Sequence, residues 1–243
     1  AHEDFPNYVD ALHKKGALAI ILVNGDRDRN IVLQNAMHID KPFPLPILQV
    51  ASSDNKHLKS TMMMGGESHL ILDGERLQST ATNVIASIEG SQSNTPAIGI
   101  VTPKSGWFTC AAERGGGIAI FLALAESIAA LPEPHPTVHL LASSGHELNF
   151  YGIRSYARTH RDNITKAAAW LHLGASIGAR EEPNSIAATS DEDLEKIVRQ
   201  SLSASNLELT NIRNPGPAVG GEALILSDLD TRYISFLGGH AYF

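Results

Sequence analysis

The sequence predicts an α/β protein with two domains: a smaller α+β domain, and then a larger one built on a mainly parallel sheet flanked by helices. In the second half of the chain, short apolar runs alternate regularly with helical segments, which is the spacing of βαβ units. Before them lies a polar stretch, residues 91–96, with the composition of a linker. We therefore expect one domain at residues 1–91 and the other at residues 92–243.

Composition excludes several classes of function. The 243 residues are 43% hydrophobic and 19% charged, as in ordinary globular proteins. The net charge is −7 and the longest basic run is Lys14-Lys15, so nucleic acid is not an expected partner. The most apolar stretches, residues 16–23 and 118–125, are shorter than the roughly 18 residues that span a bilayer, so we expect no membrane segment. A single cysteine, Cys110, excludes an internal disulfide and a thiolate zinc cluster but leaves the compartment open.

The first domain is predicted from short segments. The apolar run at residues 17–23 has the composition of a fully buried strand. Other strands are expected at residues 47–51, 69–72 and 82–88, with helices at residues 8–14 and 54–63. The strand at residues 82–88 would close this domain.

The second domain follows the alternating pattern. Strands are expected at residues 97–102, 137–143, 167–173, 185–189 and 233–237, with helices at residues 116–130, 150–160 and 191–204. Ser190 is the expected N-cap of the last helix. The sequence stops soon after the last strand, without a closing helix, so we expect it to be a fragment.

Titratable residues follow the strands of the predicted sheet. Ligands bind at the carboxyl ends of strands in open parallel sheets. Glu113 follows the strand at residues 97–102, His146 and Glu147 follow the next strand, and His172 lies at the end of the third. Carboxylate and imidazole groups in this number suit Zn²⁺, or less selectively Mn²⁺ or Fe²⁺, with one position left for water. We therefore expect these side chains to converge as metal ligands or acid-base groups.

Glu113 also has a simpler interpretation. A glutamate in the first turn complements the helix dipole, and Arg114 would then pair with it at the surface. The glycines at residues 115–117 lack the Lys-Ser/Thr ending of a P-loop, so close packing of helix on sheet explains them better than phosphate binding.

Nucleophilic catalysis is a further alternative. Ser144 lacks the leading glycine of the Gly-x-Ser-x-Gly elbow, which disfavours an α/β-hydrolase. Cys110 lies near a helix N-terminus, where His146 or His172 could activate it as a thiolate.

The strand-end motifs resemble a known family. Residues 86–243 are similar to the co-catalytic zinc aminopeptidases, a family that includes bacterial leucyl aminopeptidases, glutamate carboxypeptidase and glutaminyl cyclases. Residues 1–90 resemble the protease-associated domain often inserted in that family, in Lys-Gly-Ala-Leu-Ala-Ile-Ile-Leu-Val at residues 15–23 and Thr-Asn-Val-Ile-Ala-Ser-Ile-Glu-Gly at residues 82–90.

The resemblance implies roles for four residues. Glu113, in Glu-Arg-Gly-Gly-Gly-Ile-Ala, stands where the family has an aspartate that bridges two zinc ions. In Ser-Gly-His-Glu-Leu, Glu147 keeps a zinc-ligand position and His146 stands at the general base. His172 replaces the ligand aspartate of the next strand.

Two departures from the family pattern give two functional hypotheses. The loop at residues 102–107 lacks the first ligand histidine, and His240 falls a few positions before the last one. The first hypothesis is a metal-dependent hydrolase of peptide or amide bonds, in which Glu113, Glu147 and His172 hold one zinc ion and His146 is the base for a bound water.

The second hypothesis is a catalytically inactive, metal-free homologue that binds a peptide or small molecule. Lys104 or Arg114 would then supply the missing positive charge, because clustered buried anions are costly without one.

The expected substrate or ligand is a peptide or a small amide. Trp107, Arg114 and Asp228 are the predicted binding residues, with Phe108 and Arg232 beside them, because aromatic and charged side chains near the strand ends would form a specificity pocket. An aromatic pair in a loop is at least as often a packing plug, so this alternative stays open for Trp107 and Phe108. The sequence leaves the number of subunits open.

Overall fold

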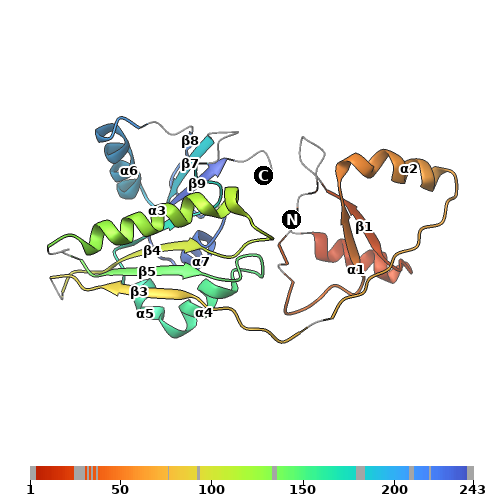
Figure 1. Ribbon diagram of the computed structural model, residues 1–243, viewed down its shortest axis with the longest axis horizontal. Helices are drawn as coiled ribbons and strands as arrows, with labels where there is room; N and C mark the ends of the chain where they lie inside the picture. The colour runs from red at the N-terminus through yellow and green to blue at the C-terminus, as the bar shows by residue number, and fades with distance from the viewer. Residues whose placement is uncertain are drawn as a thin grey trace. The chain divides into compact units, whose positions relative to one another are not determined.

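The computed structural model describes residues 4–24, 31, 33, 35–36, 38–75, 77–91, 94–132, 136–178, 184–207, 211–218 and 220–239. The chain divides into two compact units, and the division falls between Thr80 and Ala81 (Figure 1). No helix in the described part of the chain is long and apolar enough to cross a membrane.

The first unit contains two short parallel strands and two helices. In chain order these are α1 (Phe5–Lys14), β1 (Ile20–Val23), β2 (Ile47–Val50), a 3-10 turn (Ser52–Asp54) and α2 (Asn55–Met63). β1 pairs with β2 in the register Ile20 to Ile47. Burial alternates along β1, and Ile21 is 39% exposed, so the prediction of a fully buried strand is wrong. The strand predicted at residues 69–72 is also wrong, because these residues form no ladder with any described strand.

The strand predicted to close the first domain belongs to the second unit. β3 (Val84–Ile88) pairs antiparallel with β5 (Val138–Ser143), with Val84 opposite Ala142. Residues 81–91 therefore lie with the larger sheet, and the second unit begins about ten residues before the predicted boundary. An apolar strand sequence predicts pairing but does not identify the partner strand.

The second unit is built on a seven-stranded sheet with the order β3-β5-β4-β6-β9-β7-β8. Its other strands are β4 (Ile98–Pro103), β6 (Ala169–Leu173), β7 (Asn184–Thr189), β8 (Asn211–Ile212) and β9 (Tyr233–Gly239). The four central strands are parallel, whereas β3 and β7 run antiparallel to their central neighbours. The predicted α/β class with a mainly parallel sheet is confirmed.

Helices cover both faces of this sheet. They are α3 (Ala111–Ala129), α4 (Tyr151–Thr159), α5 (Arg161–Thr165), α6 (Glu192–Ala204) and α7 (Ala223–Asp228). α3 lies along the front of the sheet in Figure 1 and α7 lies behind it. The N-cap of α6 is Asp191, which accepts a hydrogen bond from the Leu194 amide at 3.1 Å, so the prediction of Ser190 is wrong by one residue.

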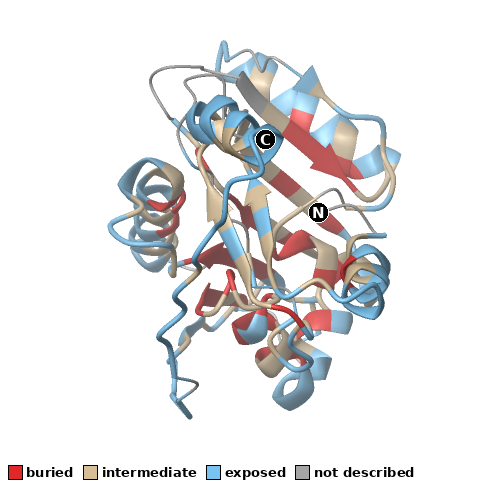
Figure 2. Cartoon of the chain, turned by 90° about the vertical axis from the view of Figure 1, so that its right-hand side faces the viewer, coloured by how far each residue is buried: buried red, intermediate tan, exposed pale blue. Residues whose placement is uncertain are grey.

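The main core lies between the sheet and α3. Ile100, Leu140 and Leu173 pack from three neighbouring strands against Phe121 of α3. Trp170 and Tyr156 are also buried, and their rings meet edge to face. Figure 2 shows that buried residues gather along the strands and that the helices carry exposed residues on their outer sides. This packing holds the carboxyl ends of the strands in fixed positions.

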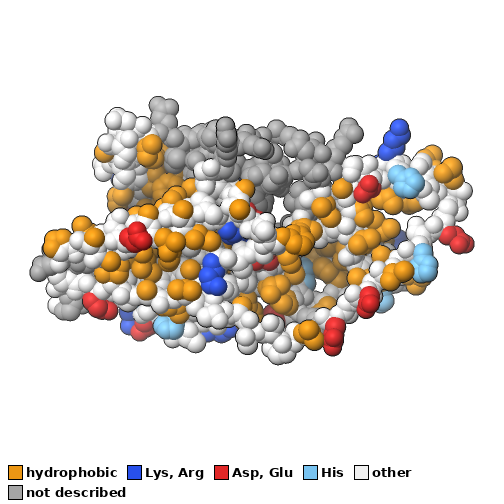
Figure 3. All heavy atoms as spheres, viewed as in Figure 1, with side chains coloured by type: hydrophobic (Ala, Val, Ile, Leu, Met, Phe, Trp, Pro, Cys, Tyr) orange, Lys and Arg blue, Asp and Glu red, His pale blue; other side chains and the backbone are white. Residues whose placement is uncertain are grey.

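The outer surface of α3 is apolar. Ile120 and Leu122 are 38% and 55% exposed, and the same face shows many hydrophobic and few charged side chains in Figure 3. An amphipathic surface helix would place charged residues there.

The three glycines at the start of α3 serve different purposes. A Cβ atom at Gly116 would overlap the Ile177 carbonyl, and one at Gly117 would lie 3.0 Å from the Gly174 carbonyl oxygen. A Cβ atom at Gly115 would meet nothing. Close packing of α3 on the loop after β6 therefore explains Gly116 and Gly117, as predicted.

This difference gives a matched pair of substitutions. Gly116→Ala is expected to lower the free energy of unfolding by roughly 1–3 kcal/mol, because the backbone must shift to relieve the overlap. Gly115→Ala is expected to leave it unchanged or raise it by up to about 1 kcal/mol, since alanine favours helix. Urea unfolding of both variants tests the prediction, and equal effects would contradict it.

Candidate functional site

The candidate site lies at the carboxyl ends of β4, β5 and β6. Two tight segments bring side chains there: residues 104–110 after β4, and residues 144–150 after β5. Both contain left-handed backbone at residues other than glycine, including Cys110 with φ 44° and Phe150 with φ 54°. Such conformations are costly and cluster at functional sites.

Arg114 joins the two predicted glutamate ligands. Its Nη2 atom lies 2.9 Å from Glu113 Oε1 and 2.9 Å from Glu147 Oε1. Its Nε donates to the Ser105 carbonyl oxygen at 2.6 Å. The expected pair between Arg114 and Glu113 is present. Its expected place at the surface is wrong for the arginine, because Arg114 is only 5% exposed and its guanidinium lies inside, where it contacts both carboxylates.

The other oxygen of each carboxylate also has a donor from the protein. The Ser105 hydroxyl donates to Glu147 Oε2 at 2.7 Å, and the Cys110 thiol donates to Glu113 Oε2 at 2.8 Å. Burial alone would raise the pKa of Glu147, but the hydrogen bonds from Arg114 and Ser105 hold it below its ordinary value. Glu147 is therefore ionised at neutral pH, and each of the four carboxylate oxygens contacts a donor.

The two predicted histidines lie in a second cluster, around a glutamate that the sequence did not reveal. Glu222 is fully buried, and His146 Nδ1 lies 3.1 Å from both of its oxygens. His172 Nε2 lies 3.4 Å from Glu222 Oε2, within the range of an ion pair but without the geometry of a hydrogen bond. The His146 ring packs edge to face on Phe150, which fixes its orientation.

Serine hydroxyls complete this cluster. Ser143 donates to Glu222 Oε1 at 2.8 Å, and Ser235 Oγ lies 2.8 Å from His172 Nδ1. Burial alone would raise the pKa of Glu222, but the hydrogen bond from His146 and the proximity of His172 lower it below its ordinary value. The result is a buried carboxylate stabilised by two imidazoles.

The predicted ligands thus separate into two groups. Glu113 and Glu147 bind Arg114, whereas His146 and His172 bind Glu222. Across the described part of the chain, no three His, Cys, Asp or Glu side chains are arranged to hold a metal ion. The carboxylates do not fit a zinc site as they stand, because a guanidinium already contacts one oxygen of each.

Glu222 has a weak sequence signal. It follows Gly220-Gly221 at the start of a short apolar run. A Cβ atom at Gly221 would lie 2.5 Å from His172 Cε1, so glycine is needed where this segment approaches the histidine. A lone glutamate after two glycines is too common a pattern to identify a buried residue.

Cys110 is not an activated nucleophile. Burial and the hydrogen bond to Glu113 raise the pKa of its thiol to about 11. No contact joins its sulfur to His146 or His172 in the described structure. The alternative of a cysteine nucleophile is therefore wrong in this arrangement.

The raised pKa of Cys110 predicts slow alkylation of its thiol. At pH 8 the folded protein is expected to react with iodoacetamide about a hundredfold more slowly than an ordinary cysteine, because the reactive thiolate is scarce. Glu113→Gln should accelerate the reaction by removing the negative charge beside the sulfur. The protein in guanidinium is the control, and since Cys110 is the only cysteine, an ordinary rate in the folded state would contradict the prediction.

The remaining predicted residues lie apart from these clusters. Trp107 and Phe108 are 37% and 91% exposed, in the same loop as Ser105. Asp228 ends α7 and lines a separate hollow, and Arg232 binds Asp191 in two hydrogen bonds of 2.9 and 2.8 Å.

Lys104 and His240 are the last two residues that the sequence suggested for the site. Lys104 is exposed, and no ion pair joins it to any described carboxylate, so of the two cations Lys104 and Arg114 only Arg114 contacts the predicted glutamates. His240 lies outside the described residues.

Solved structures of peptidases and glutaminyl cyclases share this fold. The chain is similar to a peptidase M28 precursor from Shewanella amazonensis SB2B, at 20% identity and a TM-score of 0.70 over 97% of this chain and 55% of that one. It is similar to an aminopeptidase from Aneurinibacillus sp. strain AM-1, at 15% identity and a TM-score of 0.67 over 98% of this chain and 59% of that one. A glutaminyl cyclase from an Acidobacteriales bacterium matches 64% of this chain and 57% of its own, at 17% identity and a TM-score of 0.53.

These similarities show the fold. No protein-family model matches the sequence, and no curated protein is similar to it in sequence. The chain spans little more than half the length of the peptidase and aminopeptidase that it matches.

Proposed function

We propose that this chain is a peptidase-fold protein that binds a peptide or small amide without metal and without hydrolysing it. The observation that carries the proposal is the position of Arg114, whose guanidinium lies 2.9 Å from one oxygen of both Glu113 and Glu147. It supplies, from within the chain, the positive charge that a metal ion would bring to these two carboxylates.

The energetics of the carboxylates support this proposal. A metal ion would have to displace the buried Arg114 from Glu113 and Glu147, and also disturb the donors Ser105 and Cys110. The guanidinium would then be buried without a carboxylate partner, which costs several kcal/mol. Metal binding at this position is therefore opposed by the chain itself.

The loop over the carboxylates offers a surface for a ligand. Ser105 anchors it by donating to Glu147, and the next residues include the exposed aromatic side chains Trp107 and Phe108. Aromatic side chains present large apolar areas at low entropic cost, which suits contact with peptide side chains.

The proposal also includes the first unit, which ends at residue 80, as a protease-associated-like domain. Its two parallel strands with flanking helices fit that resemblance.

A metal-dependent hydrolase is the second candidate. It is favoured by His172 Nε2, a fully buried atom that has no hydrogen-bond partner in the described structure. Together with His146 and Glu222 it supplies two imidazoles and one carboxylate, a donor set that suits zinc, although these side chains would have to rearrange to hold a metal ion. Here Glu222 would replace Glu113 and Glu147 as the carboxylate ligand.

Metal content distinguishes the two candidates. The purified protein is incubated with zinc, manganese or iron, desalted and measured by elemental analysis, together with Glu147→Ala and Glu222→Ala. The proposal predicts far less than one ion per chain in every sample. About one ion per chain that is lost in Glu222→Ala would favour the hydrolase, and screening of amide and peptide substrates would follow.

Tryptophan fluorescence tests peptide binding. The chain has only two tryptophans, and Trp170 is fully buried while Trp107 is partly exposed. A peptide that binds at the loop is expected to shift the Trp107 emission in a saturable way, and Trp107→Phe should abolish this shift. If no member of a peptide mixture gives a saturable response, the binding proposal is wrong.

A further inference from the structure

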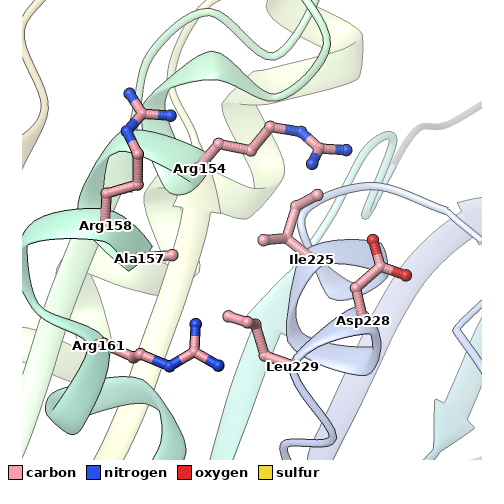
Figure 4. Close-up of a pocket in the computed structure, with 7 residues that line it drawn as sticks. All are labelled: Arg154, Ala157, Arg158, Arg161, Ile225, Asp228 and Leu229. Atoms are coloured by element: carbon pink, nitrogen blue, oxygen red, sulfur yellow. The ribbon is translucent and has the colours of Figure 1, made fainter.

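A hollow with three arginines is lined by residues of α4, α5 and α7, and none of the residues of the two clusters described above lines it. It has a volume of about 340 Å³. Figure 4 shows its lining residues, here called the arginine pocket: Arg154, Ala157, Arg158, Arg161, Ile225, Asp228 and Leu229. In this view Arg154 and Arg161 extend toward α7, whereas Arg158 runs along α4.

The three arginine charges are not balanced by carboxylates of the described residues. In the described part of the chain, no carboxylate lies within ion-pairing distance of Arg154, Arg158 or Arg161. The nearby Asp162 is neutralised by Lys166 at 2.8 Å instead. Three guanidinium groups that have no carboxylate partner among the described residues line one hollow, in a chain whose net charge is −7.

The pocket has a fixed base. Ala157 and Ile225 are buried and form an apolar floor. Arg154 is held by its own loop, since its Nε donates to the Asn149 carbonyl oxygen at 3.0 Å. The Arg158 guanidinium lies 5.8 Å from the centre of the Tyr151 ring, a cation–π contact that holds it at the rim. Arg161 makes no such contact, so it is the group most available to a ligand.

We propose that the arginine pocket binds the phosphoryl group of a small phosphorylated molecule. Three guanidinium groups and one carboxylate, Asp228, give the pocket a net charge of +2. A phosphate monoester carries about −1.5 to −2 at neutral pH, which matches this charge better than a single carboxylate does. Guanidinium groups pair with phosphate through two parallel hydrogen bonds, and the volume suits a small ligand.

Binding of inorganic phosphate, measured by calorimetry, tests the proposal. We expect saturable binding at one site per chain. Arg161→Ala should weaken it about tenfold, since one charge-assisted contact is lost. Arg158→Ala should weaken it less. Asp228→Asn should strengthen it by removing a repelling charge. Arg199→Ala, an exposed arginine of α6 that pairs with Glu195, is the matched control and should change nothing.

Three outcomes would overturn the proposal. One is the absence of saturable binding, and another is an equal loss in Arg199→Ala and Arg161→Ala, which would indicate nonspecific attraction. The third is binding to vesicles that contain phosphatidic acid without binding to inorganic phosphate, which would assign the pocket to a lipid headgroup. Thermal melts of all variants confirm that each one folds, as expected for substitutions at exposed side chains.

Discussion

Replacing Glu222 with leucine is expected to lower the free energy of unfolding by about 3–5 kcal/mol, the effect typical of removing one partner from a buried ion pair. The carboxylate is fully buried and accepts hydrogen bonds from Ser143 and His146, with His172 at 3.4 Å. Leucine would leave these donors buried without an acceptor. Urea unfolding at pH 7 measures the loss.

Two controls separate this effect from a general loss of charge. Glu195→Leu removes a glutamate that pairs with Arg199 at the surface, and it should cost less than about 1 kcal/mol. Glu222→Gln keeps an acceptor for Ser143 and His146, so it should cost less than Glu222→Leu. If Glu222→Leu is no more damaging than Glu195→Leu, the buried cluster does not stabilise the fold.

The same carboxylate predicts acid sensitivity. The pKa of Glu222 in the folded protein lies below its ordinary value of 4.5, so the folded state binds this proton less readily than the unfolded state does. Its contribution to stability is therefore present above about pH 4.5 and is lost as the pH falls below that value. The free energy of unfolding of Glu222→Gln should decrease less between pH 5 and pH 3 than that of the wild type.

The fold was largely predictable because its signals are local. Apolar runs with polar boundaries identified the central strands, and the early glycines of α3 indicated close packing on the sheet. The pairing of β3 was not predictable, since the apolar pattern at residues 84–88 suits an edge strand in either unit. Strand pairing depends on residues far apart in the sequence, here Val84 and Ala142.

The candidate site was predictable in its location but not in its contacts. Glu113, Glu147 and His172 do lie at the carboxyl ends of neighbouring strands or at the helix that follows. The contacts of these residues involve partners that the sequence did not indicate. The Arg114 side chain lies between two carboxylates, and Glu222 contacts His172 from a position 50 residues later in the sequence. No periodicity or motif encodes either contact. The contact of Arg114 with both glutamates could therefore be seen only in the structure.

Arg114→Met tests what holds the two carboxylates together. Methionine has a similar length but no charge, so Glu147 would remain buried beside Glu113 without its cation. Because Glu113 is one-third exposed and can be partly solvated, we expect a loss of about 3 kcal/mol, toward the lower end for a broken buried pair. Lys166→Met, which removes a highly exposed pair with Asp162, should cost less than about 1 kcal/mol.

The melting temperature of Arg114→Met in the presence of divalent cations tests whether Arg114 excludes a metal ion. With the guanidinium gone, Glu113 and Glu147 regain oxygens that can contact a cation, and a cation that binds only the folded state raises its stability. Zinc or magnesium should therefore raise the melting temperature of Arg114→Met and leave that of the wild type unchanged. If zinc stabilises the wild type as much as the variant, Arg114 does not exclude a metal ion, and the proposal of a metal-free binding protein fails. If zinc stabilises neither the wild type nor Arg114→Met, the two carboxylates form no cation site even without the guanidinium. Arg114 would then neutralise the glutamates but would not replace a metal ion.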